Sequence, residues 1–134
     1  MILLVSGATK YPRDRTVGHL IVPGQWNDPA TLDLSQPHAF DNGAFGGAFD
    51  RGQFVSMLEA YAPYLNDQAL FVSAPDVIYK SRIGDAAATR RQWPFWSRLI
   101  TGLGYKPAFV CQDGLLPSQV PWDELGALFI GGST

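Results

Sequence analysis

Several polar residues stand out because each follows a short apolar run. Asp41, Asp76 and Gln112 lie one to a few residues past such runs, and Gly131-Gly132 ends the last one. Ionised carboxylates only accept hydrogen bonds, an amide donates and accepts, and glycine backbone N–H groups donate. These groups match the edge of a guanine-like base, whose ring N–H and exocyclic amine would face the carboxylates. Its carbonyl oxygen would face the amide or a backbone N–H.

An aromatic side chain close to Asp41 adds a stacking surface. Phe45 follows four residues later, and its ring would stack on the face of a base. Buried donors and acceptors discriminate strongly between bases, because the wrong base leaves them unpaired. The sequence therefore predicts a pocket for a flat, purine-like base.

Each of these segments also has a purely structural interpretation. Residues 41–43 (Asp-Asn-Gly) form a turn signal, 75–76 (Pro-Asp) fit a strand end or a helix cap, and 112–114 (Gln-Asp-Gly) fit a tight turn. The glycine pair 131–132 allows close approach of backbones, and Phe45 fits a hydrophobic core. The predicted site depends on all of these segments meeting at one edge.

Continuous apolar runs predict the strands that would bring the segments together. Parallel strands buried on both faces need such runs, whereas half-exposed strands alternate. The runs cover residues 2–5, 39–40, 69–72, 107–111 and 127–130. Residues 7–37 are rich in Gly, Pro, Asp and Asn, and we expect a long irregular connection there.

Helical patterns lie between some of these runs. Asp50 is expected to cap a helix that reaches about Tyr61, and Asp85 a second helix that reaches about Leu103. Pro94 lies inside the second helix and is expected to kink or split it. Residues 117–125 look like a short helical turn with Ser118 as its cap.

Alternating strands and helices indicate an α/β fold with a parallel sheet, which can close in two ways. A doubly wound sheet usually has a glycine-rich phosphate turn after its first strand, and residues 6–9 (Ser-Gly-Ala-Thr) match one poorly. A barrel places its chemistry at the carboxyl ends of many strands. We therefore expect a partial (β/α)8 TIM-type barrel of about five parallel strands with intervening helices, with residues 1–134 as a single domain.

The composition limits the classes of function. A formal charge of −2 argues against a nucleic-acid binder held by bulk charge, so any such contact would be local. Four basic residues in two loops at the expected mouth are candidates for phosphate contacts or, equally, ordinary solvated charges: Lys10, Arg13, Lys80 and Arg82. One cysteine and two distant histidines give no metal-ligand spacing, and no membrane span is expected. A cytoplasmic location and no cofactor within the chain are the corresponding expectations.

As a set, several segments resemble the tRNA-guanine transglycosylase (queuine tRNA-ribosyltransferase) superfamily. The chain is most similar to its small phage and actinobacterial relatives, which group with enzymes that place 7-deazaguanines in DNA. The segments cover essentially the whole chain: 4–11 (LVSGATKY), 41–45 (DNGAF), 74–77 (APDV), 84–89 (GDAAAT), 112–114 (QDG), 121–123 (PWD) and 128–134 (LFIGGST).

The family segment Asp-Ser-Gly-Gly-Phe/Tyr-Gln supplies a pocket aspartate and an aromatic that stacks on the base. Asp41 and Phe45 match these two positions, and Asp41 is the catalytic candidate in this chain. Asn42 and Ala44 depart from the usual Ser and Gly, and Gly46 stands where Gln is usual.

The resemblance also assigns the other strand-end residues to the base. Asp76 matches a second aspartate that binds the base edge, and Gln112 matches a glutamine that contacts the base. Gly131 and Gly132 match a glycine pair that provides backbone hydrogen bonds. The implied ligand is guanine or a 7-deazaguanine, and the implied polymer is DNA or tRNA.

In this family, a nucleophilic aspartate and a structural zinc site come from the later half of the barrel, which this chain is expected to lack. We therefore expect the base-recognition part of a base-exchange glycosyltransferase, completed by a second chain: another copy or a separate C-terminal half. The cytoplasm would be that of the host cell if the protein is phage-encoded. The alternatives are a non-catalytic truncated barrel that binds a 7-deazapurine or a partner protein, and a hydrolytic N-glycosidase.

Overall fold

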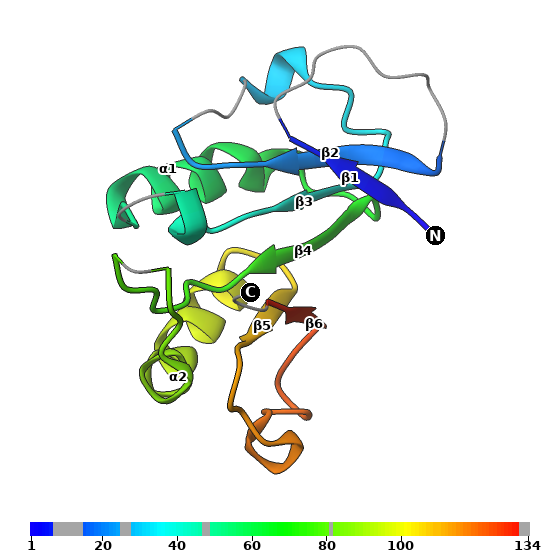
Figure 1. The fold of residues 1–134 in the computed structure, drawn as a ribbon. Helices are drawn as coiled ribbons and strands as arrows, with labels where there is room; N and C mark the ends of the chain where they lie inside the picture. The colour runs from blue at the N-terminus through cyan, green and yellow to red at the C-terminus, as the bar shows by residue number, and fades with distance from the viewer. Residues whose placement is uncertain (7–14, 25–27, 47–48, 81, 132–134) are drawn as a thin grey trace.

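Six parallel strands form a curled sheet that resembles half of a barrel (Figure 1). The computed structural model describes residues 1–6, 15–24, 28–46, 49–80 and 82–131. Each strand pairs with the next one along the chain, in the order β1 to β6. The strands are β1 (Leu3–Val5), β2 (Val17–Ile21), β3 (His38–Phe40), β4 (Ala69–Ser73), β5 (Pro107–Cys111) and β6 (Ala127–Ile130).

This strand order confirms the α/β class with a parallel sheet and decides between the two closures. A doubly wound sheet reverses its strand order near the middle, whereas here the order is sequential throughout. The carboxyl ends of all six strands therefore lie along one rim. The carboxyl ends of β3, β4, β5 and β6 are each followed by a segment that contains a predicted base contact.

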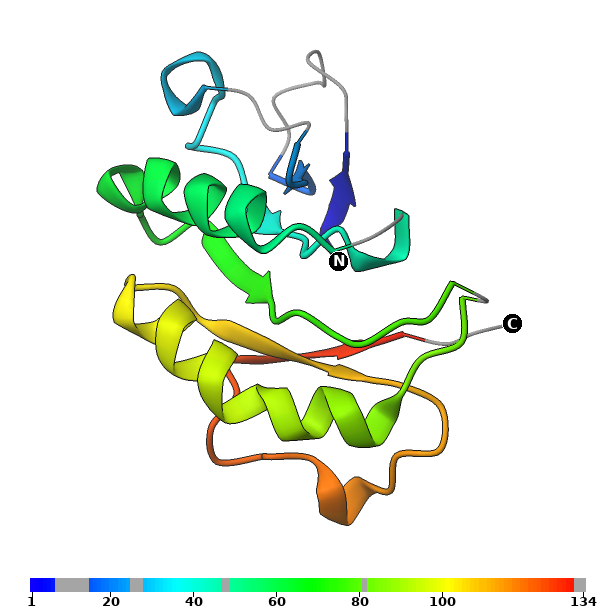
Figure 2. The same ribbon diagram turned by 90° about the vertical axis from the view of Figure 1, so that its left-hand side faces the viewer.

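Two α-helices cover one side of the sheet, α1 (Arg51–Tyr61) between β3 and β4 and α2 (Ala86–Gly102) between β4 and β5. Figure 2, seen from this side, shows both helices in front of the strands. The remaining helical turns are short: η1 (Pro29–Thr31), η2 (Ala44–Gly46), η3 (Ala62–Tyr64) and η4 (Pro117–Gln119). In the part of the chain that is described, α-helices thus occupy two of the five connections between strands, whereas a regular (β/α) barrel has a helix in each. None of these helices combines the length and the apolar character that crossing a bilayer requires.

The predicted caps of the two α-helices are confirmed. Asp50 accepts a hydrogen bond from the backbone N–H of Gln53 at 3.0 Å, and Asp85 accepts one from that of Ala88 at 2.8 Å. Pro94 does not split α2, which runs through it as one element. The proline is exposed, so its ring lies on the solvent side of the helix.

Two local predictions are wrong. Residues 7–37 contain strand β2, which the glycine and histidine at its centre concealed. A Cβ atom on Gly18 would lie 1.9 Å from the carbonyl oxygen of Pro37, so the close approach of β2 to the segment that precedes β3 requires glycine. Ser118 lies inside η4, whose cap is Leu116. The backbone N–H of Leu116 donates to the side chain of Gln119 instead.

The hydrophobic core lies between the helices and one face of the sheet. Phe40, Val72 and Phe109, one each from β3, β4 and β5, pack in one cluster with the buried faces of the helices. These faces contribute Phe54, Met57, Leu58, Tyr61, Trp93, Trp96 and Ile100. Because strand side chains alternate, the residues next to these point to the opposite, helix-free face.

A pair of buried histidines lies side by side on β2 and β3. His19 pairs with His38 in the strand register, and both are nearly inaccessible to solvent. The Nδ1 atom of His38 lies 2.9 Å from the carbonyl oxygen of Gln36, so Nδ1 carries a hydrogen in the neutral ring. Burial lowers the pKa of His38 from its ordinary value of 6.5, against the smaller raising effect of this hydrogen bond.

We expect the free energy of unfolding to decrease as the pH falls below 6.5. The folded state disfavours the protonated imidazole, so the unfolded state binds more protons between 6.5 and the lower folded pKa. Urea titrations at about pH 7.5 and about pH 5.5 measure this difference. His38→Asn keeps a donor near Gln36 and should reduce the dependence, and an unchanged dependence in that variant would contradict the assignment.

Candidate functional site

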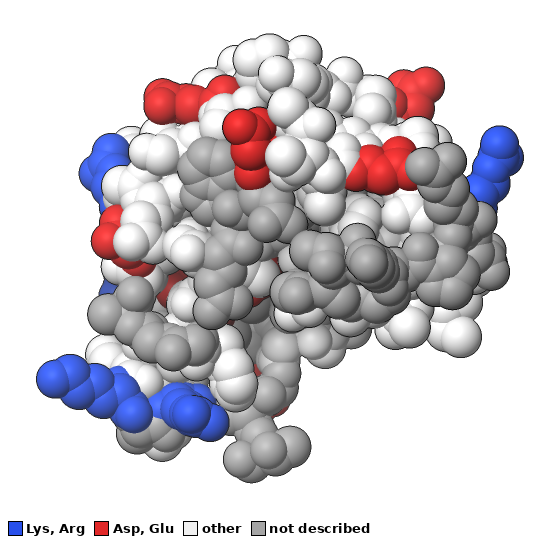
Figure 3. All heavy atoms as spheres, turned by 90° about the horizontal axis from the view of Figure 1, so that it is seen from above, with Lys and Arg blue, Asp and Glu red and all other residues white. Residues whose placement is uncertain are grey.

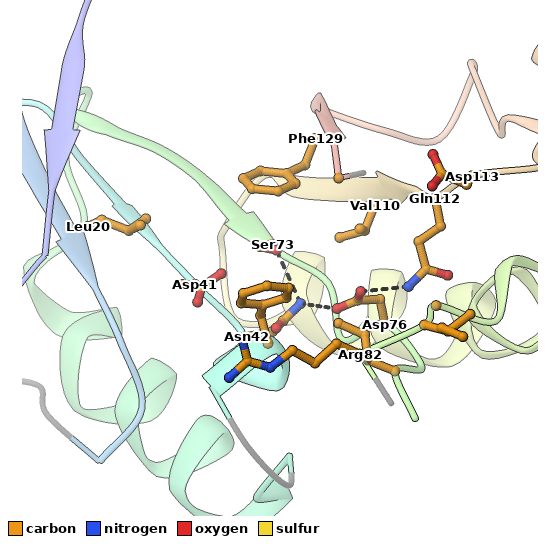
Figure 4. A pocket seen from close by; sticks show the side chains of 15 residues that line it. Leu20, Asp41, Asn42, Ser73, Asp76, Arg82, Val110, Gln112, Asp113 and Phe129 are labelled. Carbon is orange, nitrogen blue, oxygen red and sulfur yellow. Dashed lines mark hydrogen bonds between the residues drawn. The ribbon is translucent and has the colours of Figure 1, made fainter. Parts of the chain in front are cut away.

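A cavity of about 430 Å³ opens on the helix-free face of the sheet, near the carboxyl ends of the strands. Its floor contains Leu20, Val110 and Phe129, from β2, β5 and β6 (Figure 4). Val110 lies next to Phe109 of the core, so the alternation along β5 separates the two environments. The volume lies within the range of about 300–1,000 Å³ that is usual for small-molecule sites.

Five of the six residues predicted to contact the base line this one cavity, and so does Arg82, which was predicted as a phosphate contact. Asp41 follows β3 directly, Asp76 follows β4, Gln112 follows β5 and Gly131 follows β6. Phe45 of η2 completes the set. The sequential strand order brings these distant segments together, and their roles toward a ligand stay predictions.

The Asp76 carboxylate is the centre of a hydrogen-bond network (Figure 4). The side-chain amide of Asn42 donates to its Oδ1 atom at 2.8 Å, and the amide of Gln112 donates to its Oδ2 atom at 2.8 Å. The donors come from the ends of β3 and β5, the two neighbours of β4 in the sheet. The carboxylate is thus held from both sides.

Burial raises the pKa of Asp76 above its ordinary value. The hydrogen bonds from Asn42 and Gln112 favour the ionised form and lower this pKa in part, while the nearby negative charge of Asp41 raises it. Three carboxylates, those of Asp41, Asp76 and Asp113, thus line one cavity. Such a site favours ligands with N–H donors and disfavours anions.

The 41–43 segment is both a turn and part of the cavity wall. The Asp41 carboxylate accepts a hydrogen bond from the backbone N–H of Gly43 at 3.2 Å, and Gly43 has a φ of 74°. The Asn42 amide oxygen accepts one from the backbone N–H of Ala44 at 2.8 Å. The turn and site interpretations of this segment are therefore compatible, because the turn aims Asn42 at Asp76.

Phe45 is exposed, and a cation lies over its ring. The Arg82 guanidinium carbon is 5.5 Å from the ring centroid, a geometry in which a cation is attracted to the aromatic face. Arg82 has a φ of 62°, the only positive value at a non-glycine residue in the described ranges. Backbone strain of this kind often marks a functional position.

Arg82 belongs to one of the two basic loops that the sequence predicts at the mouth of the site. The loop spans residues 77–85, and an antiparallel bridge between Ile78 and Gly84 closes it. The Tyr79 hydroxyl also donates to the Asp85 carboxylate at 2.6 Å. The loop contributes Ile78, Arg82, Ile83 and Gly84 to the cavity wall. The sequence predicted the basic residues of this loop at the mouth, but not the contribution of Ile78, Ile83 and Gly84 to the cavity wall.

Two predicted base contacts are already engaged within the protein. The amide nitrogen of Gln112 donates to Asp76 and, at 3.2 Å, to the carbonyl oxygen of Val77, which uses both of its hydrogens. The backbone N–H of Gly131 donates to the carbonyl oxygen of Cys111 at 3.0 Å, as part of the sheet. Gly132 lies outside the described residues.

On the face seen in Figure 3, the described Lys and Arg side chains lie near the margin, with some of them next to one another at the lower left, and they form no broad patch. Lys80 is exposed in the 77–85 loop, two residues before Arg82. Lys10 and Arg13 lie outside the described residues. Within the described ranges, no group of three His, Cys, Asp or Glu side chains could hold a metal ion.

Comparisons with protein-family models, with curated proteins and with solved structures found no match to this chain. The resemblance to the transglycosylase superfamily therefore depends on the residues of this sequence. The functional interpretation depends on the geometry of the cavity described above.

Proposed function

We propose that the chain binds a guanine-type base, guanine or a 7-deazaguanine, in the cavity at the carboxyl ends of its strands. On this proposal, it is the base-recognition part of a base-exchange glycosyltransferase that acts on DNA or tRNA. The observation that carries the proposal is the convergence of Asp41, Phe45 and Asp76 on one cavity of about 430 Å³. Within the described part of the chain, the hydrogen bonds of the Asp41 and Asp76 carboxylates come from neutral amide and backbone groups rather than from Lys or Arg.

The chemistry of the cavity supports a base with adjacent N–H donors. Each Asp76 oxygen accepts one amide hydrogen, and the backbone N–H of Asp76 also interacts with the carboxylate, so part of its roughly four lone-pair sites stays available to a ligand. On this proposal, the available carboxylate lone pairs accept hydrogen bonds from the ring N–H and the exocyclic amine of guanine. The exposed ring of Phe45 offers an apolar face for the flat ligand.

We expect 7-deazaguanine to bind to the wild-type chain in a calorimetric titration and hypoxanthine to bind more weakly. Hypoxanthine lacks the exocyclic amine, so one carboxylate oxygen would stay unpaired in the complex. Asp76→Asn should weaken 7-deazaguanine binding at least about tenfold, or about 1.4 kcal/mol, because the new amide places a donor against a donor.

Asp123→Asn is the matched control, since it removes the same charge from an exposed position away from the cavity lining. It should bind 7-deazaguanine like the wild type. The absence of wild-type binding, or equal binding by Asp76→Asn, would refute the proposed ligand.

The transferase part of the proposal predicts exchange of labelled guanine into DNA or tRNA when the chain is assembled with a second chain that supplies the nucleophile. Asp41→Ala should reduce incorporation at least about tenfold if Asp41 acts in the exchange. Incorporation is measured as acid-precipitable label after incubation with each polymer. Saturable base binding without exchange would instead favour the non-catalytic binding module, and release of free base without incorporation would favour the N-glycosidase.

We also propose that a second chain, either another copy or a separate C-terminal half, covers the two open edges of the sheet. Leu3 on β1 is 62% exposed and Ile130 on β6 is 80% exposed, and such edge strands promote pairing with other chains. Light scattering after size-exclusion chromatography should show association, and Ile130→Lys should weaken it. A stable, non-aggregating wild-type monomer without a second chain would contradict this proposal.

A further inference from the structure

We propose that Gln112 and Asn42 are positioning residues that hold the Asp76 carboxylate toward the cavity, and that Gly84 provides the space that the Gln112 amide needs. The expected effect on ligand binding rests on the proposed function of the cavity, whereas the positioning of the carboxylate is independent of that function. This role differs from the direct base contact that the family resemblance assigns to Gln112.

A chain of hydrogen bonds fixes the orientation of the Gln112 amide. The hydroxyl oxygen of Thr89 accepts the backbone N–H of Val77 at 2.9 Å, and the hydroxyl donates to Gln112 Oε1 at 3.1 Å. Oε1 therefore faces Thr89, which leaves Nε2 to face Asp76 and the carbonyl oxygen of Val77. Gln112 is 8% exposed and has no amide hydrogen left for a ligand.

Asn42 holds the other carboxylate oxygen in a similar way. Its amide nitrogen donates to Asp76 Oδ1, and it also lies 3.0 Å from the carbonyl oxygen of Ala74 and 3.2 Å from the hydroxyl of Ser73. Its own oxygen is bound to the backbone N–H of Ala44. Both carboxylate oxygens are thus oriented by buried amides whose own positions are fixed.

Gly84 is needed for space rather than for its backbone conformation. A Cβ atom at this position would lie 2.5 Å from Cδ and 2.6 Å from Nε2 of Gln112, closer than side-chain atoms pack. Its φ is not among the positive values that favour glycine. An alanine here would displace the flexible end of Gln112 and so release one side of Asp76.

A pH titration of the Asp76 carboxyl carbon by NMR tests this positioning directly, without any ligand. Gly84→Ala should raise the pKa of Asp76 above the wild-type value, because the ionised carboxylate loses a hydrogen-bond donor. Other charged groups that line the cavity are the same in both proteins: Asp41 after β3, Arg82 in the 77–85 loop and Asp113 after β5. A structural role of Gly84 elsewhere would not move this titration.

Gly102→Ala is the matched control, since a Cβ atom there meets no other atom within 4 Å. It should leave the pKa of Asp76 unchanged. Gln112→Leu removes the amide without adding bulk at position 84, and it should raise the pKa as Gly84→Ala does. Thr89→Val should act in the same direction, and Thr89→Ser should retain the wild-type titration because it keeps the hydroxyl.

Binding of 7-deazaguanine separates this inference from the proposed function. Gly84→Ala should weaken that binding at least about fivefold, while Gly102→Ala binds like the wild type. If the wild type does not bind 7-deazaguanine but the pKa of Asp76 rises in Gly84→Ala and Gln112→Leu, only the proposed function fails. If the pKa of Asp76 is the same in the wild type, Gly84→Ala and Gln112→Leu, the positioning role is refuted.

Discussion

Parallel pairing of the strands in chain order is the constraint on which the site depends. It aligns the carboxyl ends of neighbouring strands, so residues more than thirty positions apart, such as Asn42 and Asp76, come within hydrogen-bond distance. Side-chain alternation then divides the strand residues between two faces. One face packs against α1 and α2 in an aromatic core, and the other leaves a cavity lined by the strand ends. The cavity and the core are thus two sides of one sheet.

Within that cavity, the energetics centre on one buried acid. Moving a carboxylate out of water costs several kcal/mol unless donors replace the lost hydration, and a hydrogen bond to a charged group contributes roughly 1.5–3 kcal/mol. The amides of Asn42 and Gln112 offset this cost only in part, and the pKa of Asp76 stays raised. Both donors are neutral amides. They therefore orient the carboxylate but leave its charge in place, whereas an arginine would neutralise that charge. A neutral ligand with N–H groups can then use the remaining lone pairs.

Much of the fold could be predicted from the sequence because local signals were strong. Five apolar runs match strands to within one residue at either end, and the side chains of Asp50 and Asp85 form the expected caps. Strand β2 was missed because Gly18 interrupts its apolar run, and only the tertiary structure shows the close backbone approach that requires this glycine. Asp41, Phe45, Asp76, Gln112 and Gly131 line one cavity. The partner of the Gln112 amide, however, depends on distances among Thr89, Val77 and Asp76 that no sequence pattern encodes.

A crystal structure of the protein grown with 7-deazaguanine tests the central claim most directly. The cavity should hold the base, with the ring N–H and exocyclic amine within hydrogen-bond distance of the two Asp76 oxygens and the ring against Phe45. The amides of Asn42 and Gln112 should stay on the carboxylate in that complex. A base bound elsewhere on the molecule, or an empty cavity at saturating ligand, would contradict the claim that these strand ends form a guanine-type base pocket.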